Sequence, residues 1–182
     1  MGKTSIMRED ILSTETIFDG RIVHLKVHTV RLPDGNESKR ELIHHQGAVA
    51  IVAVDQYQHV LLVKQFRLGT NDDTIEIPAG ILEPNEDPQA AVARELREET
   101  GYRPLNVESL GGMYVAPGYT TEYIHLYYAS GYEKAPLEQD ADEFVEALRI
   151  PLKDAVAMVE RGEIVEGKSI VALLKIARKL GI

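Results

Sequence analysis

The sequence contains no cysteine and no long apolar run, and it is short of positive charge. Without cysteine, disulfides, thiolate metal sites and cysteine nucleophiles are all excluded. No apolar stretch reaches the roughly 18 residues of a membrane span, and the N-terminal MGKTSIMREDIL lacks the apolar core of a signal peptide, so we expect a cytoplasmic protein without membrane association. A net charge of −9, from 29 acidic and 20 basic residues, argues against a nucleic-acid-binding surface.

The residues that are present suffice for a folded domain. A chain of 182 residues with 44% hydrophobic content can bury a proper core as one domain. The acidity is concentrated in residues 80–102 and 133–146. This concentration is more typical of metal-site chemistry than of a uniformly solvated surface.

Hydrophobic patterning predicts a mixed α/β protein. Residues 22–31 alternate apolar and polar, a turn follows at 33–36, and 37–45 continue as a second strand, so we expect an N-terminal β-hairpin. Further strands are predicted at 48–54, 60–66, 74–78, 107–115, 123–129 and 143–150. Two helical patterns, 152–161 and 167–180, end the chain.

The segment GILEPNEDPQAAVARELREETGY, residues 80–102, predicts one further helix with clear ends. Asp87 suits the N-cap, and Pro88 suits the first helical position, where its missing N–H costs nothing. No glycine or proline interrupts the run to Thr100, and Gly101 is a typical C-terminal stop.

Carboxylates crowd one side of this predicted helix. Glu95 and Glu99 are one turn apart, and Glu98 lies in the same sector, beside an apolar stripe that includes Leu96. A solvated helix face with ion pairs would account for these charges alone, but not for the spacing of glycines around them. Oxygen ligands without histidine or cysteine suit hard divalent cations, Mg²⁺ or alternatively Mn²⁺.

The spacing G-x5-E-x7-R-E-U-x-E-E-x-G-U, in which U is a bulky apolar residue, resembles the box of the Nudix hydrolase family. Only Tyr102, at a position that is usually aliphatic, departs from it. The resemblance implies an α/β/α sandwich around a mixed sheet, with the box as a loop–helix–loop. Residues 46–182 would form the Nudix hydrolase domain, and residues 1–45 would form an accessory hairpin that serves dimerisation.

The same resemblance implies a set of metal ligands. Glu95 and Glu99 would be the principal ligands, together with the backbone carbonyl of Ala79. Glu98 would support them as an additional ligand or as a base. Glu86 and Arg94 would form an ion pair that orients the box.

A general base is expected outside the box, in the acidic segment 138–146. In ADP-ribose pyrophosphatases an acidic loop occupies this place, and Glu143 falls at the matching position just before Phe144-Val145. Glu143 is therefore the expected base or additional metal ligand, and Asp142 is the alternative.

Further sequence features resemble the ADP-ribose pyrophosphatase subfamily. Pro117 follows the box at the subfamily's spacing, and VKQFR, EIPAG and MVERGEIVEGKSIVALL agree with it. The family pattern implies that Arg67 and Arg40 contact phosphate or ribose through bidentate donors. Glu122 would accept hydrogen bonds from sugar hydroxyls or adenine, and Arg21 is a further candidate on the adenine side.

The resulting hypothesis is a homodimeric, metal-dependent enzyme that hydrolyses ADP-ribose to AMP and ribose 5-phosphate. GDP-mannose or another nucleoside-diphosphate sugar is the alternative substrate. A non-catalytic, ADP-ribose-binding regulator is a second alternative, although such proteins normally lose box glutamates that this chain keeps. An RNA-end pyrophosphohydrolase fits the negative net charge poorly.

Overall fold

The computed structural model describes residues 7–138 and 144–182, and the chain divides into two compact units. The first unit comprises the chain up to Gln46 together with Tyr114–Glu122. The second comprises Gly47–Met113 and Tyr123–Ile182.

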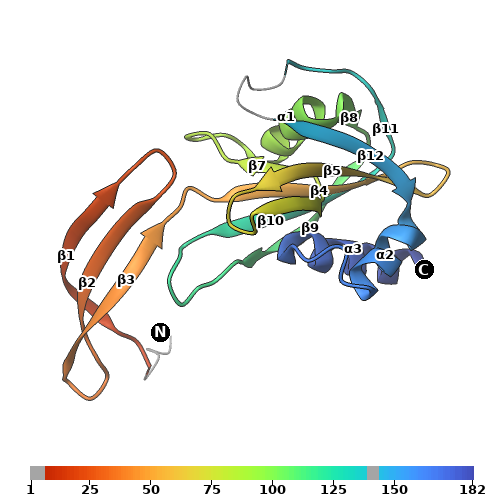
Figure 1. Cartoon of the computed structure of the whole chain (residues 1–182). Coiled ribbons are helices and arrows are strands. Elements are labelled where there is room, and N and C mark those ends of the chain that lie inside the picture. The colour runs from red at the N-terminus through yellow and green to blue at the C-terminus, as the bar shows by residue number, and fades with distance from the viewer. Residues whose placement is uncertain (1–6, 139–143) are drawn as a thin grey trace. The chain divides into compact units, whose positions relative to one another are not determined.

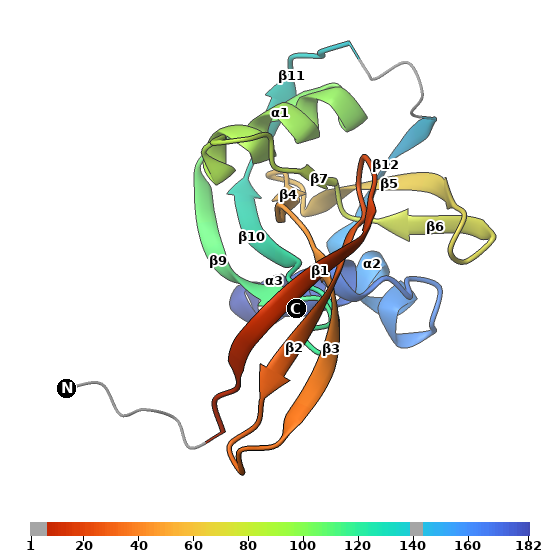
Figure 2. The same ribbon diagram turned by 90° about the vertical axis from the view of Figure 1, so that its left-hand side faces the viewer.

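The first unit is built on a three-stranded antiparallel sheet with the order β1-β2-β3. The strands are β1 (Asp10–Asp19), β2 (His24–Arg31) and β3 (Glu37–His44). The predicted hairpin is therefore present as β2 and β3, and β1 adds a third, long strand along β2 (Figure 2). Every residue of β1 is exposed, which explains why its sequence carries no inward-facing apolar pattern.

The loop that carries Pro117 belongs to the first unit, where it is bonded to the end of β3. The N–H of Ile43 donates to the carbonyl of Tyr119 at 2.8 Å, and the N–H of Thr121 donates to the carbonyl of Ile43 at 2.9 Å. The N–H of His45 also donates to Oγ1 of Thr121 at 2.9 Å. These bonds make residues 114–122 an extension of the small sheet.

The second unit contains a seven-stranded mixed sheet, in which the main order is β12-β5-β4-β10-β9. Strand β10 runs parallel to β4, whereas β12 and β6 pair antiparallel with β5, and β7 pairs antiparallel with β4. The strands are β4 (Ala48–Val54), β5 (His59–Arg67), β6 (Asp72–Glu76), β7 (Ala79–Ile81), β9 (Val107–Tyr114), β10 (Tyr123–Ser130) and β12 (Val145–Pro151). A separate pair joins β8 (Tyr102–Pro104) to β11 (Tyr132–Lys134).

Helices cover both faces of this sheet, as Figure 1 shows. Helix α1 (Pro88–Thr100) packs on one face, and α2 (Leu152–Glu160) and α3 (Gly167–Leu180) pack on the other. Strand β4 is buried throughout, and its residues alternate between the two apolar clusters that result. This is the predicted α/β/α sandwich around a mixed sheet.

No helix among the described residues is long and apolar enough to span a membrane.

Candidate active site

The ends of α1 are set by the residues that the sequence indicated. Oδ2 of Asp87 accepts hydrogen bonds from the backbone N–H groups of Gln89 and Ala90, so Asp87 is the N-cap. Gly101 ends the helix in the left-handed conformation, with φ of 78°. The carboxylates of the last turns are therefore held on a well-defined helix.

Two of these glutamate side chains are buried. Glu95 is 9% exposed and Glu99 is 5% exposed. Oε2 of Glu99 accepts a hydrogen bond of 3.0 Å from the backbone N–H of Ala79 in β7. A Cβ at Gly80 would lie 2.0 Å from the carboxyl carbon of Glu95, so only glycine admits this carboxylate beside β7. Charged groups at such sites require compensation by a cation or by hydrogen bonds.

Arg94 provides part of that compensation. Its Nε and Nη2 bind the two oxygens of Glu86 at 3.0 and 2.9 Å, which confirms the predicted ion pair. Its Nη1 donates to Glu95 at 2.7 Å and to Glu98 at 3.0 Å. Hydrogen bonds from Arg94 lower the pKa of Glu86, and those to Glu86 raise the pKa of Arg94.

The donor set fits a hard divalent cation. Among the described residues, no three histidine, aspartate or glutamate side chains are gathered as a ready-made cage. The carboxylates of Glu95 and Glu99 nevertheless lie against the same short strand, at Gly80 and Ala79. Oxygen donors beside a glycine that leaves room for them suit Mg²⁺ or Mn²⁺ better than softer metals.

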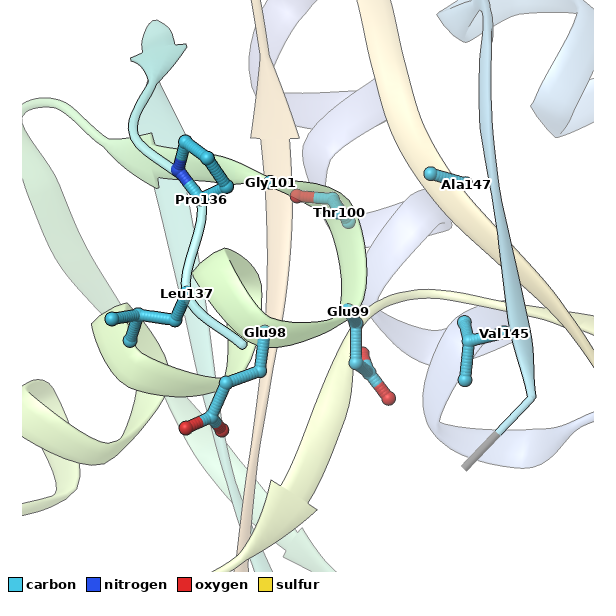
Figure 3. A pocket seen from close by; sticks show the side chains of 8 residues that line it. All are labelled: Glu98, Glu99, Thr100, Gly101, Pro136, Leu137, Val145 and Ala147. Atoms are coloured by element: carbon cyan, nitrogen blue, oxygen red, sulfur yellow. The ribbon is translucent and has the colours of Figure 1, made fainter. Parts of the chain in front are cut away.

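A pocket of about 430 Å³ opens at the C-terminal end of α1 (Figure 3). Glu98 and Glu99 project from the last turn of the helix, with Leu137 on the side of Glu98 and Val145 on the side of Glu99. The other lining residues are Thr100, Gly101, Pro136 and Ala147. Two carboxylates thus face a cavity large enough for part of a nucleotide.

The expected base lies outside the described residues. Glu143 and the alternative Asp142 both fall within 139–143. The chain on either side of that segment lines the pocket, through Leu137 before it and Val145 after it. The assignment of Glu143 therefore stays a prediction.

Arg67, a predicted phosphate ligand, lies at the end of β5 and is held by a carboxylate of this chain. Its Nε and Nη2 each donate to Glu76 at 2.8 Å, and its side chain remains 45% exposed. The hydrogen bond to Glu76 raises the pKa of Arg67, and the charge of Glu99 contributes in the same direction. Arg67 thus lies within electrostatic range of Glu99 on α1.

The remaining predicted substrate ligands belong to the first unit. Arg40, on β3, forms a fork with Glu9 at 3.0 and 2.6 Å. Arg21 is exposed in the turn between β1 and β2. Glu122 is half-buried, and its backbone carbonyl accepts a hydrogen bond from the N–H of Val115. These three roles stay predictions.

Sequence reasoning did not single out a buried ionic cluster beneath Arg67. Glu76 is 1% exposed and binds Lys168, which is 8% exposed, at 2.7 Å. Lys168 also contacts Glu166 at 3.1 Å. The subfamily motif EIPAG contains Glu76, and the motif MVERGEIVEGKSIVALL contains Glu166 and Lys168, so both segments were recognised in the sequence. Their pairing across the fold was not.

The charge of Glu76 makes the stability of the protein depend on acidity. Burial would raise the pKa of Glu76, but hydrogen bonds from Arg67 and the charge of Lys168 outweigh it and hold the pKa at about 2, against an ordinary 4.5. A depressed folded-state pKa gives stability that is present above about pH 4.5 and is lost as the pH falls towards 2. Wild-type protein should therefore lose unfolding free energy in this range.

Glu76→Gln should lose less unfolding free energy than wild type over the same acid range, because a glutamine does not titrate there. It should also be less stable than wild type near neutral pH, where it leaves Lys168 without its buried partner. Urea unfolding at about pH 7 and pH 3 measures both effects, with Glu160→Gln as an exposed control. An equal acid loss in wild type and Glu76→Gln would show that another group is responsible.

Two protein families match the chain in succession. Residues 9–43 match the nucleoside diphosphate sugar hydrolase N-terminal domain, and residues 44–172 match the NUDIX domain. The second match spans most of the chain and includes every carboxylate of α1 described above.

Individual proteins resemble the chain over nearly its whole length. A methanol dehydrogenase activator of Bacillus methanolicus is 40% identical over 95% of this chain and 94% of its own. An ADP-ribose pyrophosphatase of Bacillus subtilis is 39% identical over 92% of this chain and 91% of its own. The crystal structure of an ADP compounds hydrolase superposes with a TM-score of 0.86 at 23% identity, covering 98% of this chain and 97% of that one. This last likeness concerns the fold.

Proposed function

The chain belongs to the Nudix family, and from this premise we propose that it hydrolyses the diphosphate of ADP-ribose to AMP and ribose 5-phosphate. The observation that carries the proposal is the pair of buried carboxylates, Glu95 and Glu99, placed against the backbone of β7. A diphosphate is already anionic, so an attacking oxygen is repelled unless positive charge is present. Divalent cations held by the two carboxylates would supply this positive charge. The 39% identity to an ADP-ribose pyrophosphatase supports the choice of substrate.

Mg²⁺ is the proposed cofactor, with Mn²⁺ as a substitute, and Glu95, Glu99 and the carbonyl of Ala79 are the proposed ligands. When bound, such an ion screens the phosphate charge, lowers the pKa of bound water and stabilises the leaving phosphate. Glu98 is proposed as an additional ligand or a base, and Glu143 as the principal base.

Two arginines near the carboxylates have separate proposed roles, one in binding the substrate and one in holding the Nudix box together. Arg67 is proposed to donate to a phosphate oxygen through Nη1, since Nε and Nη2 are already committed to Glu76. Arg94 holds the segment that precedes α1 against the helix through its two hydrogen bonds to Glu86. The pocket at the end of α1 offers Glu98 and Glu99 to a ligand lying across it.

A panel of nucleoside diphosphate derivatives tests the proposed function. ADP-ribose, GDP-mannose, another nucleoside-diphosphate sugar and a nucleoside triphosphate are incubated with the protein and Mg²⁺ or Mn²⁺, and products are separated by chromatography. We expect ADP-ribose to give the highest kcat/KM, with AMP as a product. A higher value for GDP-mannose would select the alternative substrate, and binding of ADP-ribose without turnover would indicate a regulator.

We also propose that the chain forms a homodimer through its first 45 residues. A sheet of only three strands needs a hydrophobic face, or packing against another element, for independent stability. Its strand β1 exposes large apolar side chains, with Ile11 at 63%, Ile17 at 51% and Phe18 at 56%. Burial of this surface against a second copy would explain its composition. Arg40 is then proposed to contact the substrate held by the partner subunit, and Arg21 and Glu122 remain proposed substrate ligands.

Mixing two inactive variants tests the shared site. Arg40→Ala and Glu99→Gln subunits are each expected to be nearly inactive alone. If Arg40 serves the partner's substrate, a mixed dimer holds one doubly damaged site and one intact site. A statistical mixture should then recover up to about a quarter of wild-type activity. No recovery after demonstrated subunit exchange, or a monomer by sedimentation, would contradict the proposal.

A further inference from the structure

Two consecutive residues of α3 hold two consecutive residues at the end of β6. The ammonium of Lys168 binds the carboxylate of Glu76 at 2.7 Å. Oγ of Ser169, which is 0% exposed, accepts a hydrogen bond of 2.9 Å from the backbone N–H of Ile77. The N-cap Glu166 accepts from Oγ of Ser169 at 2.7 Å and so fixes the hydroxyl. These hydrogen bonds join the N-terminal end of α3 to the end of β6, just before the Nudix box.

The carboxylate of Glu76 is saturated by this arrangement. Oε1 accepts from Arg67 Nε at 2.8 Å and from Thr74 Oγ1 at 2.6 Å. Oε2 accepts from Arg67 Nη2 at 2.8 Å and from Lys168 Nζ at 2.7 Å. Four donors for two oxygens leave the carboxylate one orientation, which in turn fixes the guanidinium of Arg67.

The segment that follows β6 contacts a carboxylate of α1. Pro78 follows Ile77, and its carbonyl accepts a hydrogen bond of 3.0 Å from the N–H of Ile51. Ala79 comes next, and its N–H binds Glu99. Thus the buried cluster, Arg67 and the proposed metal ligands are joined through one short segment, residues 76–80.

Removal of Lys168 would change the surroundings of Arg67 in a specific way. Lys168 lies between two carboxylates, at 2.7 Å from Glu76 and 3.1 Å from Glu166. Both Glu166 and Glu99 already act electrostatically on Arg67. Without the ammonium, Arg67 would be the one charged donor left among the hydrogen bonds to Glu76 described above, so we expect its guanidinium to be drawn towards Glu76 and away from Glu99.

We propose that Lys168 is a positioning residue for the hydrolysis: it fixes the Glu76 carboxylate and thereby holds the guanidinium of Arg67 towards the α1 carboxylates, where the substrate diphosphate binds. The proposal rests on the proposed function and adds to it a residue on α3, outside the Nudix box. Lys168 does not touch the substrate, and its effect passes through Arg67.

A double-mutant cycle between Lys168 and Arg67 tests this dependence. Lys168→Met should lower kcat/KM for ADP-ribose by about tenfold to a hundredfold, the usual cost of losing a supporting partner. In an Arg67→Ala background the same substitution should cost less than about threefold, because the group through which it acts is gone. Lys179→Met is the matched control, since Lys179 lies on the same helix and pairs with Glu108, and it should leave kcat/KM unchanged.

A second reading of the cycle is independent of turnover and of metal. The Kd for ADP-ribose is measured by calorimetry with a chelator present, and Lys168→Met should weaken binding only where Arg67 is intact. Equal losses in both backgrounds, or no loss from Lys168→Met, would overturn the positioning role. If Lys168→Met does not fold, Lys168→Gln keeps a hydrogen-bond donor without the charge and enters the same cycle. A wild-type protein that binds ADP-ribose without hydrolysing it refutes the proposed function instead, while the Kd cycle still tests Lys168.

Discussion

Glu99→Gln is expected to lower kcat by several orders of magnitude and to leave the fold intact. Glutamine has the same size, and its side-chain oxygen can still accept the hydrogen bond from Ala79 N–H. It lacks the negative charge that we propose holds a divalent cation beside Glu95. Activity is measured with saturating Mg²⁺ by the release of AMP, and the fold by circular dichroism and thermal unfolding.

The matched control for this variant is Glu160→Gln at the exposed end of α2, which should behave as wild type. Near-normal turnover by Glu99→Gln in saturating Mg²⁺ would mean that the carboxylates of α1 serve structure and not catalysis. A raised KM with unchanged kcat would instead place Glu99 in substrate binding.

Gly80→Ala should also reduce activity strongly, for a steric reason. The added Cβ would lie 2.0 Å from the carboxylate of Glu95, at the free end of a side chain that can move aside. The fold should therefore lose little stability, whereas the carboxylate is displaced from β7. We expect metal affinity and kcat/KM to fall by about tenfold to a hundredfold or more.

Gly69→Ala is the control for that substitution, because a Cβ at Gly69 meets no atom within 4 Å. It should leave the affinity for Mn²⁺ and the activity unchanged. If Gly80→Ala and Gly69→Ala had the same metal affinity, metal binding would not depend on the position of the Glu95 carboxylate beside β7.

The local parts of the site were predictable from the sequence because short-range rules govern them. Asp87 as N-cap, Gly101 as the left-handed stop and the ion pair between Glu86 and Arg94 were all expected, and all are present. Strand β4 was predicted with its observed limits, since a short apolar run with several β-branched residues is typical of a strand that is buried on both faces.

The parts that were not predictable depend on contacts between distant segments or on weak local patterns. Lys168 and Glu76 are 92 residues apart, and neither sequence neighbourhood indicates the other. Strand β1 was missed because it exposes every residue, and β7 because it has three residues. The arginine Arg67 was predicted as a phosphate ligand, but its fork to Glu76 emerged only from the pairing of β5 with β6.

The claim on which the account depends is that Glu95 and Glu99 together hold a divalent cation. Titration with Mn²⁺, followed by the electron paramagnetic resonance signal of the free ion, measures this directly and without substrate. We predict that wild-type protein binds Mn²⁺ stoichiometrically and that Mg²⁺ displaces the bound Mn²⁺. Folded Glu99→Gln should bind Mn²⁺ far more weakly than wild type. Equal Mn²⁺ binding by wild type and Glu99→Gln would contradict the account.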